Sequence, residues 1–282
     1  MNDEVRGIPS DFFLVLMTDY QLSNSGNGRK LEKFGPLLIN RPSLQAVWKP
    51  DGAFQQADAV FTRDPNGEWT FARELPESWV VEVDGIRFKL SFTDFGHLGI
   101  FPEQRTSWNW IRRHARDGAN VLNLFAYSGG STMAAAQGGA KVTHLDASRK
   151  MVSWAKENAA LNELEGIRWI VDDAQKFLKR EIRRGNRYDA IIMDPPSFGR
   201  GAKGEVFKIE KDLQDILESC KQLLSDKPLF FLISCHSPGF TPFVLKHLLA
   251  QMFNEGKIEC GEMFLEGTLP VPSGCFARWR AD

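Results

Sequence analysis

Three aspartates follow apolar runs that are predicted to be neighbouring strands, and together they suggest a ligand site. They are Asp146 after residues 141–145, Asp173 after residues 167–171, and Asp194 after residues 188–193. Ligands of open α/β sheets bind outside the carboxyl ends of the strands. An acid after the second strand suits a ribose diol, and an acid after the third suits the amino group of an adenine. The alternative for Asp146 and Asp173 is helix N-capping, which aspartate does well.

The exit of the fourth predicted strand has its own chemistry, in the run Asp194-Pro195-Pro196-Ser197-Phe198. Two prolines fix the backbone and remove two donors, so carbonyl groups there can accept bonds from an amine or a base edge. Phe198 can stack on a planar substrate, or it can simply pack in the core. Arg200 and Lys203 follow in a glycine-containing loop. They can reach RNA phosphates or belong to an ordinary surface loop.

Cys235 ends the fifth predicted strand and is followed by His236. A thiolate that adds to carbon 6 of a cytosine turns carbon 5 into a nucleophile for a methyl donor, and a base then removes the carbon-5 proton. His236 can lower the thiol pKa, and Asp194 can hold the ring nitrogen. The alternative is a buried cysteine that acts as a small apolar residue.

A strand–turn–helix–strand unit over residues 120–146 must position these groups. Residues 121–125 are predicted to be a strand, 131–137 a helix and 141–145 a second strand. The glycines in the turn let the backbone approach a ligand. The GxGxxG motif of dinucleotide-binding oxidoreductases is absent from this turn. Strands and helices alternate from here on, which predicts a parallel sheet covered on both faces.

Residues 1–84 differ from residues 85–282 and are predicted to be a small β-rich domain or an extension of the main sheet. We expect a strand over 11–18, a polar loop over 23–30 and a hairpin over 60–72. A second hairpin over 79–91 turns at Asp84-Gly85, and a helix begins near Thr106.

Composition sets few limits on function. The chain has 282 residues, 43% of them hydrophobic, and a net charge of −1, which does not exclude a nucleic-acid partner because the positive charge can lie on one face. Residues 179–187 are rich in Lys and Arg and are predicted to be a solvated helix face. The four cysteines lack metal-site spacing, so no metal is expected and reduced thiols favour the cytoplasm. The N-terminal apolar run over 12–17 is too short for a membrane span.

Four segments carry a resemblance to a known family: GIFPEQR, LNLFAYSGGSTMAAAQGGA, DDAQKFL and MDPPSFGRG. They are similar to class I S-adenosylmethionine-dependent methyltransferases. More narrowly, they resemble bacterial 23S ribosomal RNA large-subunit methyltransferases of the cytosine-5 and guanine-7 type. The resemblance is good over residues 90–240. It implies a Rossmann-like, seven-stranded class I methyltransferase sheet with helices on both faces.

The resemblance also implies a role for individual residues. Cofactor contacts fall on Phe125, Tyr127, Ser128, Gly129, Gly130, Asp146, Ala147, Asp173, Ala174 and Asp194. Catalytic roles fall on Asp194, Pro195 and Cys235, and substrate contacts on Arg105, Pro196, Ser197, Phe198, Arg200 and Lys203. The implied cofactor is S-adenosyl-L-methionine and the implied partner is ribosomal RNA. We expect a monomer or homodimer that is not bound to a membrane.

Two features depart from the family pattern. Residues 1–84 are too few for the RNA-binding PUA domain and the small αβ domain that cytosine-5 members carry, and Ser197 stands where many members have lysine. Three alternatives therefore stay open. The first is a methyltransferase that acts on a nitrogen of a base, of a protein or of a small molecule, with Cys235 structural. The second is a protein that binds the cofactor without turnover. The third is an oxidoreductase.

Overall fold

The computed structural model describes residues 19–63, 67–200, 204 and 206–282. Its centre is a seven-stranded sheet. The strand order is β10 (Arg168–Val171), β9 (Lys141–Asp146), β8 (Asn120–Leu124), β11 (Ala190–Met193), β14 (Phe230–Cys235), β16 (Val271–Arg280) and β15 (Lys257–Leu265). The strands from β10 to β14 are parallel, and β16 is antiparallel to both of its neighbours. The order reverses between β8 and β11, where ligands bind in such sheets, and the predicted fold class is confirmed.

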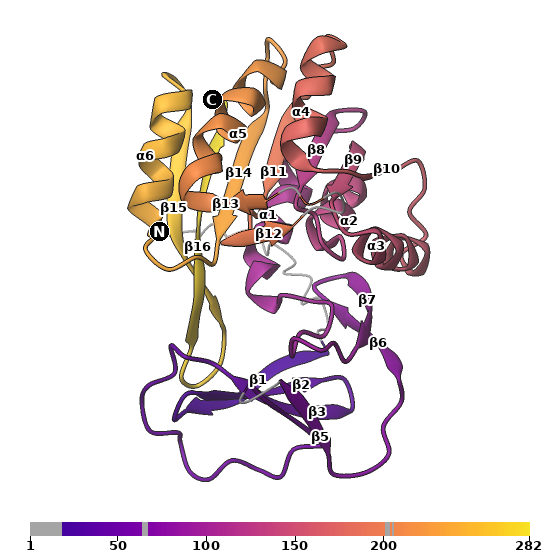
Figure 1. The fold of residues 1–282 in the computed structure, drawn as a ribbon, viewed down its shortest axis with the longest axis vertical. Coiled ribbons are helices and arrows are strands. Elements are labelled where there is room, and N and C mark those ends of the chain that lie inside the picture. The colour runs from indigo at the N-terminus through magenta and orange to yellow at the C-terminus, as the bar shows by residue number, and fades with distance from the viewer. Residues whose placement is uncertain (1–18, 64–66, 201–203, 205) are drawn as a thin grey trace, which may run out of the picture.

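Helices cover both faces of this sheet (Figure 1). One face carries α1 (Arg105–His114), α2 (Gly130–Gln137) and α3 (Arg149–Leu161), and the other carries α4 (Ala174–Arg183), α5 (Ile209–Leu223) and α6 (Pro242–Met252). Successive side chains of a strand point to opposite faces. In β14, Leu232 therefore packs in the core that includes α1 and α2, whereas Ile233 packs in the core under α5 and α6.

A second, five-stranded sheet precedes the main one. Its strands are β1 (Tyr20–Gly26), β2 (Arg29–Phe34), β3 (Leu37–Pro42), β4 (Ala59–Thr62) and β5 (Glu68–Phe71). The predicted strand over 11–18 lies outside the described residues, and the predicted hairpin is present as β4 and β5.

The predicted loop over 23–30 is wrong, because this segment holds the end of β1 and the start of β2. The two strands join through Asn27-Gly28, both with positive φ (51° and 74°). That is the conformation of a two-residue hairpin turn, for which Asn-Gly is a preferred sequence.

The second predicted hairpin is present as β6 (Ser78–Val83) and β7 (Ile86–Ser91). The expected boundary after residue 84 falls in its turn. A single hydrophobic core runs from Phe34 in the N-terminal sheet through Phe88 in the hairpin to Trp108 in α1. The N-terminal region therefore packs continuously onto the rest of the chain.

A further contact joins the N-terminal sheet to the main one. The hairpin of β15 and β16 extends toward it (Figure 1), and the Ser25 hydroxyl donates a hydrogen bond to the Leu269 carbonyl at 2.9 Å. The short helix η1 (Pro102–Gln104) leads into α1, and the strands β12 (Phe198–Arg200) and β13 (Val206–Lys208) form a small hairpin beside the sheet. Within the described ranges, the helices are too short or too polar to cross a bilayer.

Candidate active site

A cleft of 630 Å³ lies at the carboxyl ends of the parallel strands and reaches the N-terminal sheet. It is lined by the following predicted site residues: Phe125, Tyr127, Asp146, Ala147, Asp173, Ala174, Asp194, Pro195 and Pro196. A smaller cavity of 40 Å³ shares Tyr127 and Asp194 with the cleft and is lined by Ser128, Gly129 and Gly130. The residues predicted for one ligand therefore meet in one place.

The turn after β8 is strained and closely packed. Phe125 and Tyr127 have positive φ angles of 55° and 49°, which are uncommon for residues other than glycine. Gly129 has φ 93°, and a Cβ there would lie 2.4 Å from the Met133 Cε. The Ser128 hydroxyl donates to the Gly99 carbonyl at 2.5 Å. Strained residues persist only where neighbouring contacts over-determine them, and they cluster at ligand sites.

Asp146 is fixed by backbone groups at the edge of the cleft. Its carboxylate accepts hydrogen bonds from the Tyr127 N–H at 2.9 Å and the Ser148 N–H at 2.8 Å. Burial raises the pKa of Asp146 and the two hydrogen bonds oppose that shift. The N-cap of α3 is Ser148, so Asp146 does not cap this helix.

Asp173 caps a helix and also lines the cleft. It is the N-cap of α4, where its carboxylate accepts a hydrogen bond from the Lys176 N–H at 3.0 Å. Asp173 also lines the cleft, so capping and ligand contact are compatible.

Asp194 lies at the centre of a polar network. Its carboxylate accepts hydrogen bonds from the Ser234 hydroxyl at 2.7 Å and the Gln104 amide at 3.2 Å. The His236 Nε2 lies 3.7 Å from Asp194 Oδ1, and the His236 Nδ1 lies 3.8 Å from Glu103 Oε1. Burial disfavours ionisation of Asp194, but His236 and the hydrogen bonds outweigh burial and lower its pKa.

His236 carries the matching positive charge. Burial alone would lower its pKa, but Asp194 and Glu103 outweigh that effect and raise the pKa of His236 to about 9. At neutral pH the site therefore holds an imidazolium beside the Asp194 carboxylate.

Comparison with known proteins identifies this arrangement. A family model described as S-adenosylmethionine-dependent methyltransferase matches residues 26–252. The chain belongs to this family.

Relatives and solved structures agree with that assignment. The methyltransferase is 38% identical over 163 residues to the ribosomal RNA large subunit methyltransferase K/L of Hahella chejuensis, which covers 57% of this chain and 22% of the relative. It is 38% identical over 194 residues to the protein of the same name from Pseudoalteromonas atlantica, which covers 67% of this chain and 26% of the relative. The chain thus spans about a quarter of the length of these curated relatives, at 22% and 26%.

Among solved structures, a SAM-dependent methyltransferase from Agrobacterium tumefaciens superposes with a TM-score of 0.89 and 39% identity, which covers 94% of this chain and 91% of that one. SMU.776, solved with S-adenosylhomocysteine (SAH), superposes with a TM-score of 0.73 and 21% identity over 92% of this chain and 75% of that one. The second likeness concerns the fold alone.

The site residues of this methyltransferase fit its family cofactor, S-adenosylmethionine. Gly129 and Gly130 line the small cavity and let the turn pack closely on the helices, because a Cβ on Gly129 would meet Met133 and one on Gly130 would meet the Trp108 ring at 2.7 Å. At the other end, Asp146 presents a carboxylate whose position two backbone groups fix. These features suit the methionine end and the ribose diol respectively.

Cys235 does not line this cleft in the methyltransferase. Its side chain is 1% exposed and packs in the core under α5 and α6, whereas the neighbouring Ser234 points to Asp194 on the opposite face. Burial raises the pKa of the Cys235 thiol, which disfavours a thiolate. His236, which was predicted to activate Cys235, lies beside Asp194 and Glu103. Strand alternation puts the Cys235 thiol on the other side of β14 from Ser234 and Asp194.

Several predicted substrate contacts also lie elsewhere. Arg105 does not line the cleft, because its guanidinium donates to both Asp84 oxygens at 3.0 and 3.1 Å. Ser197 bonds to the Ser237 hydroxyl at 2.7 Å, and Phe198 is half-exposed and outside the cleft lining. Phe207 of the paired strand β13 lines the cleft instead. The side chain of Arg200, and Lys203 as a whole, fall outside the described part of the chain.

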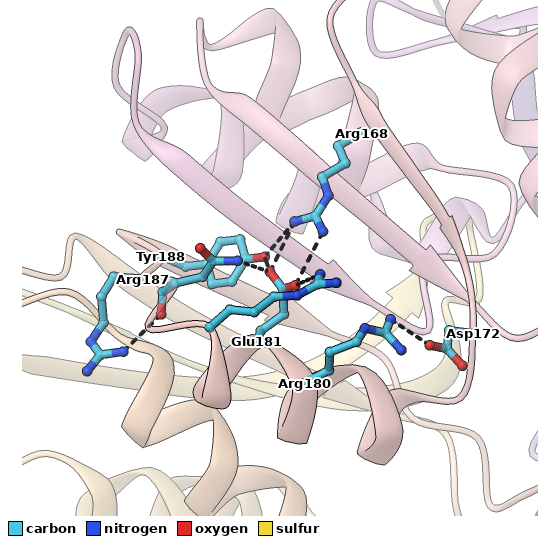
Figure 2. Close-up of polar contacts among 8 residues, drawn as sticks. Arg168, Asp172, Arg180, Glu181, Arg187 and Tyr188 are labelled. Atoms are coloured by element: carbon cyan, nitrogen blue, oxygen red, sulfur yellow. Dashed lines mark hydrogen bonds and ion pairs between the residues drawn. The ribbon is translucent and has the colours of Figure 1, made fainter.

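Several residues of the basic run after residue 178 form ion pairs and hydrogen bonds within the protein (Figure 2). Glu181 is fully buried and binds Arg168 at 3.0 Å, Tyr188 at 2.7 Å and Arg184 at 3.2 Å. Arg180 pairs with Asp172 at 2.7 Å. Arg180 and Arg184 therefore form ion pairs as well as lying on a solvated face, since the Arg184 side chain is 54% exposed.

Sequence patterns gave no sign of the N-terminal residues in the cleft. Lys30, Arg41 and Phe61 line it from the five-stranded sheet, and Arg63 lines it from the position directly after β4. Their segments contain no motif, and only the fold brings them opposite Asp194.

Proposed function

We propose that this methyltransferase transfers the methyl group of S-adenosylmethionine to a nitrogen of a base in ribosomal RNA. The observation that carries the choice of acceptor is the contrast between the residues that follow β11 and the last residue of β14. Asp194 and Pro195 line the cleft, whereas Cys235 is buried in the core on the other face. The large-subunit RNA methyltransferases among its relatives support an RNA substrate, over about a quarter of their length.

The chain's own groups would bind and orient the acceptor. The cofactor, when bound, supplies an electrophilic methyl group on a sulfonium. A base nitrogen offers its own lone pair to that carbon, so it needs no covalent help from the protein. Asp194 can accept a hydrogen bond from an N–H of the base, and the Pro195 carbonyl can accept another. Gln104 and Ser234 hold the Asp194 carboxylate in one orientation, which is the preorganisation that transfer of a group between bound molecules needs.

The main alternative is transfer to carbon 5 of a cytosine through Cys235. That route requires the thiolate within reach of the base. The burial of Cys235 and the raised pKa of its thiol weigh against it.

Nucleoside analysis tests the proposal directly. Large-subunit ribosomal RNA from a strain that lacks the protein is incubated with the pure enzyme and methyl-labelled cofactor, digested and analysed by mass spectrometry. We expect the label on a nitrogen of a base. Label in 5-methylcytidine would support the Cys235 route instead. An enzyme that binds SAH but labels no RNA would reject the RNA substrate.

A further inference from the structure

One half of the cleft is not accounted for by the cofactor. Asp146 and Asp173 lie in the cofactor half, and Asp194 lies near the middle. The remaining wall comes from the N-terminal sheet and from the loop after β7, which contributes Phe95 and His97. We call this part of the cleft the acceptor half. No role has been assigned so far to the residues of this wall.

The wall from the N-terminal sheet is positively charged. The charged residues of this wall that line the cleft are Lys30, Arg41 and Arg63. None of the described residues with which the wall lines the cleft carries a carboxylate. Glu32 lies beneath, fully buried, and pairs with Arg41 at 2.5 Å and with Lys30 at 3.2 Å. Within this wall one acid therefore pairs with two bases, and Arg63 adds a third positive charge; Glu103 of η1, outside the wall, also lines the cleft and acts on Lys30. A polyanion is the ligand that such a wall attracts.

The loop that carries Phe95 is held in place. The Arg41 guanidinium donates to the Gly96 carbonyl at 3.1 Å, and the Trp69 indole donates to the Thr93 carbonyl at 2.8 Å. The Thr93 hydroxyl also donates to the His97 carbonyl at 2.8 Å. Phe95 is consequently an exposed ring on an ordered loop, anchored by the N-terminal sheet.

Two large apolar side chains that line the cleft, Phe95 and Leu44, are exposed to solvent. Phe95 is 77% exposed and Leu44 is 72% exposed, although both line the cleft. Exposed apolar side chains beside fixed cations are the combination that binds single-stranded nucleic acid, because bases stack on rings and phosphates pair with cations.

We propose that the N-terminal sheet and the Phe95 loop form an RNA clamp. Phe95 stacks on an unpaired base, Leu44 packs on its other side or on its neighbour, and Arg63 binds an adjacent phosphate. The target base then enters the cleft toward Asp194 from a strand already held outside it. An enzyme that acts on a base must receive it out of the helical stack. This inference rests on the proposed RNA substrate and gives the N-terminal region its role.

Two substitutions with matched controls test the clamp. Phe95→Ala is compared with Phe243→Ala, a 65% exposed phenylalanine on α6 that does not line the cleft. Arg63→Ala is compared with Arg183→Ala, an exposed arginine of α4. Binding of a short fluorescein-labelled single-stranded RNA is followed by anisotropy over a salt series, with SAH present. SAH affinity is measured separately by calorimetry, and it reports that each variant is folded.

We expect Phe95→Ala to weaken RNA binding about tenfold, within the range for one stacked base. Arg63→Ala should reduce the slope of log affinity against log salt by about one unit. SAH affinity should be unchanged, and both controls should bind RNA like the wild type. RNA binding by Phe95→Ala and Arg63→Ala at control levels would overturn the clamp.

The binding experiment and the labelling experiment together separate the two proposals. If the wild type methylates RNA but the clamp variants bind it normally, only the clamp is wrong. If the wild type labels a protein and binds no RNA, the RNA substrate is wrong and the clamp is wrong with it.

Discussion

The two halves of the cleft are built in different ways. The cofactor half comes from three consecutive strand–helix units, and its residues lie at the carboxyl end of a strand, in the turn after it or at the start of the next helix. The acceptor half is assembled from β2, β3 and β4, the Phe95 loop, η1 and the ends of β11 and β14. The first is local in sequence and the second is not.

The halves also differ in what keeps them in shape. The cofactor half stores backbone strain at Phe125 and Tyr127, with small residues where a ligand approaches. The acceptor half relies on charge, with Asp194 beside His236 and Lys30 and Arg41 around Glu32. Substitutions that change geometry should therefore damage cofactor binding, and substitutions that change charge should damage the use of the acceptor.

The largest effect is expected for Asp194→Asn. The amide keeps the size of the side chain but removes the charge and one acceptor, so methyl transfer should fall by about 10²–10³. Transfer is measured under single-turnover conditions, and SAH affinity is expected to change far less. Asp189→Asn is the control. Asp189 directly precedes the first residue of β11, at the opposite end of that strand from Asp194, and its carboxylate accepts a hydrogen bond from the Asn120 N–H at 2.9 Å. Normal transfer by Asp194→Asn would contradict the assigned role.

A geometric change in the cofactor half should come next. Gly129→Ala places a Cβ at φ 93° and 2.4 Å from Met133, so we expect a loss of about 1–3 kcal/mol in the free energy of unfolding and weaker SAH binding. Gly185→Ala is the matched control. Gly185 also has positive φ, but a Cβ there would meet nothing within 4 Å, so it should lose less stability and leave SAH affinity unchanged. Urea unfolding and SAH titration measure both quantities, and equal effects in the two variants would argue against a packed cofactor turn.

The same contrast explains what sequence could predict. The strands, the glycine turn and the three aspartates follow from local patterns, and the seven-stranded sheet with helices on both faces follows from the family resemblance. Lys30, Arg41 and Arg63 carry no pattern, because their role depends on where a separate sheet packs. The turn at Asn27-Gly28 was a signal available in the sequence. The side to which Cys235 points follows from alternation along β14, but only once the position of Asp194 relative to that strand is known.

Cys235→Ala should separate the two acceptor chemistries with a smaller effect. We expect methyl transfer to be retained and stability to fall by about 1 kcal/mol, because the thiol packs in the core and its loss leaves a small cavity. Transfer and urea unfolding are measured together, with Cys260→Ala of β15 as the control at a partly exposed position. Abolished transfer with SAH binding intact would restore the covalent route to carbon 5.

His236 should also make the stability of the protein depend on pH. Its pKa is raised to about 9 in the folded protein, against an ordinary value of 6.5. A raised pKa means that the folded state holds the proton more tightly, so the stabilisation is fully present below pH 6.5 and is lost as pH rises through 9. The free energy of unfolding should therefore fall over this window in the wild type, more than in His236→Gln. His247→Gln, on α6, is the control and should follow the wild type. A titration of the His236 ring by NMR with a midpoint near 6.5 would show that Asp194 and Glu103 do not hold its charge, and the charge pairing assigned to the acceptor half would then be wrong.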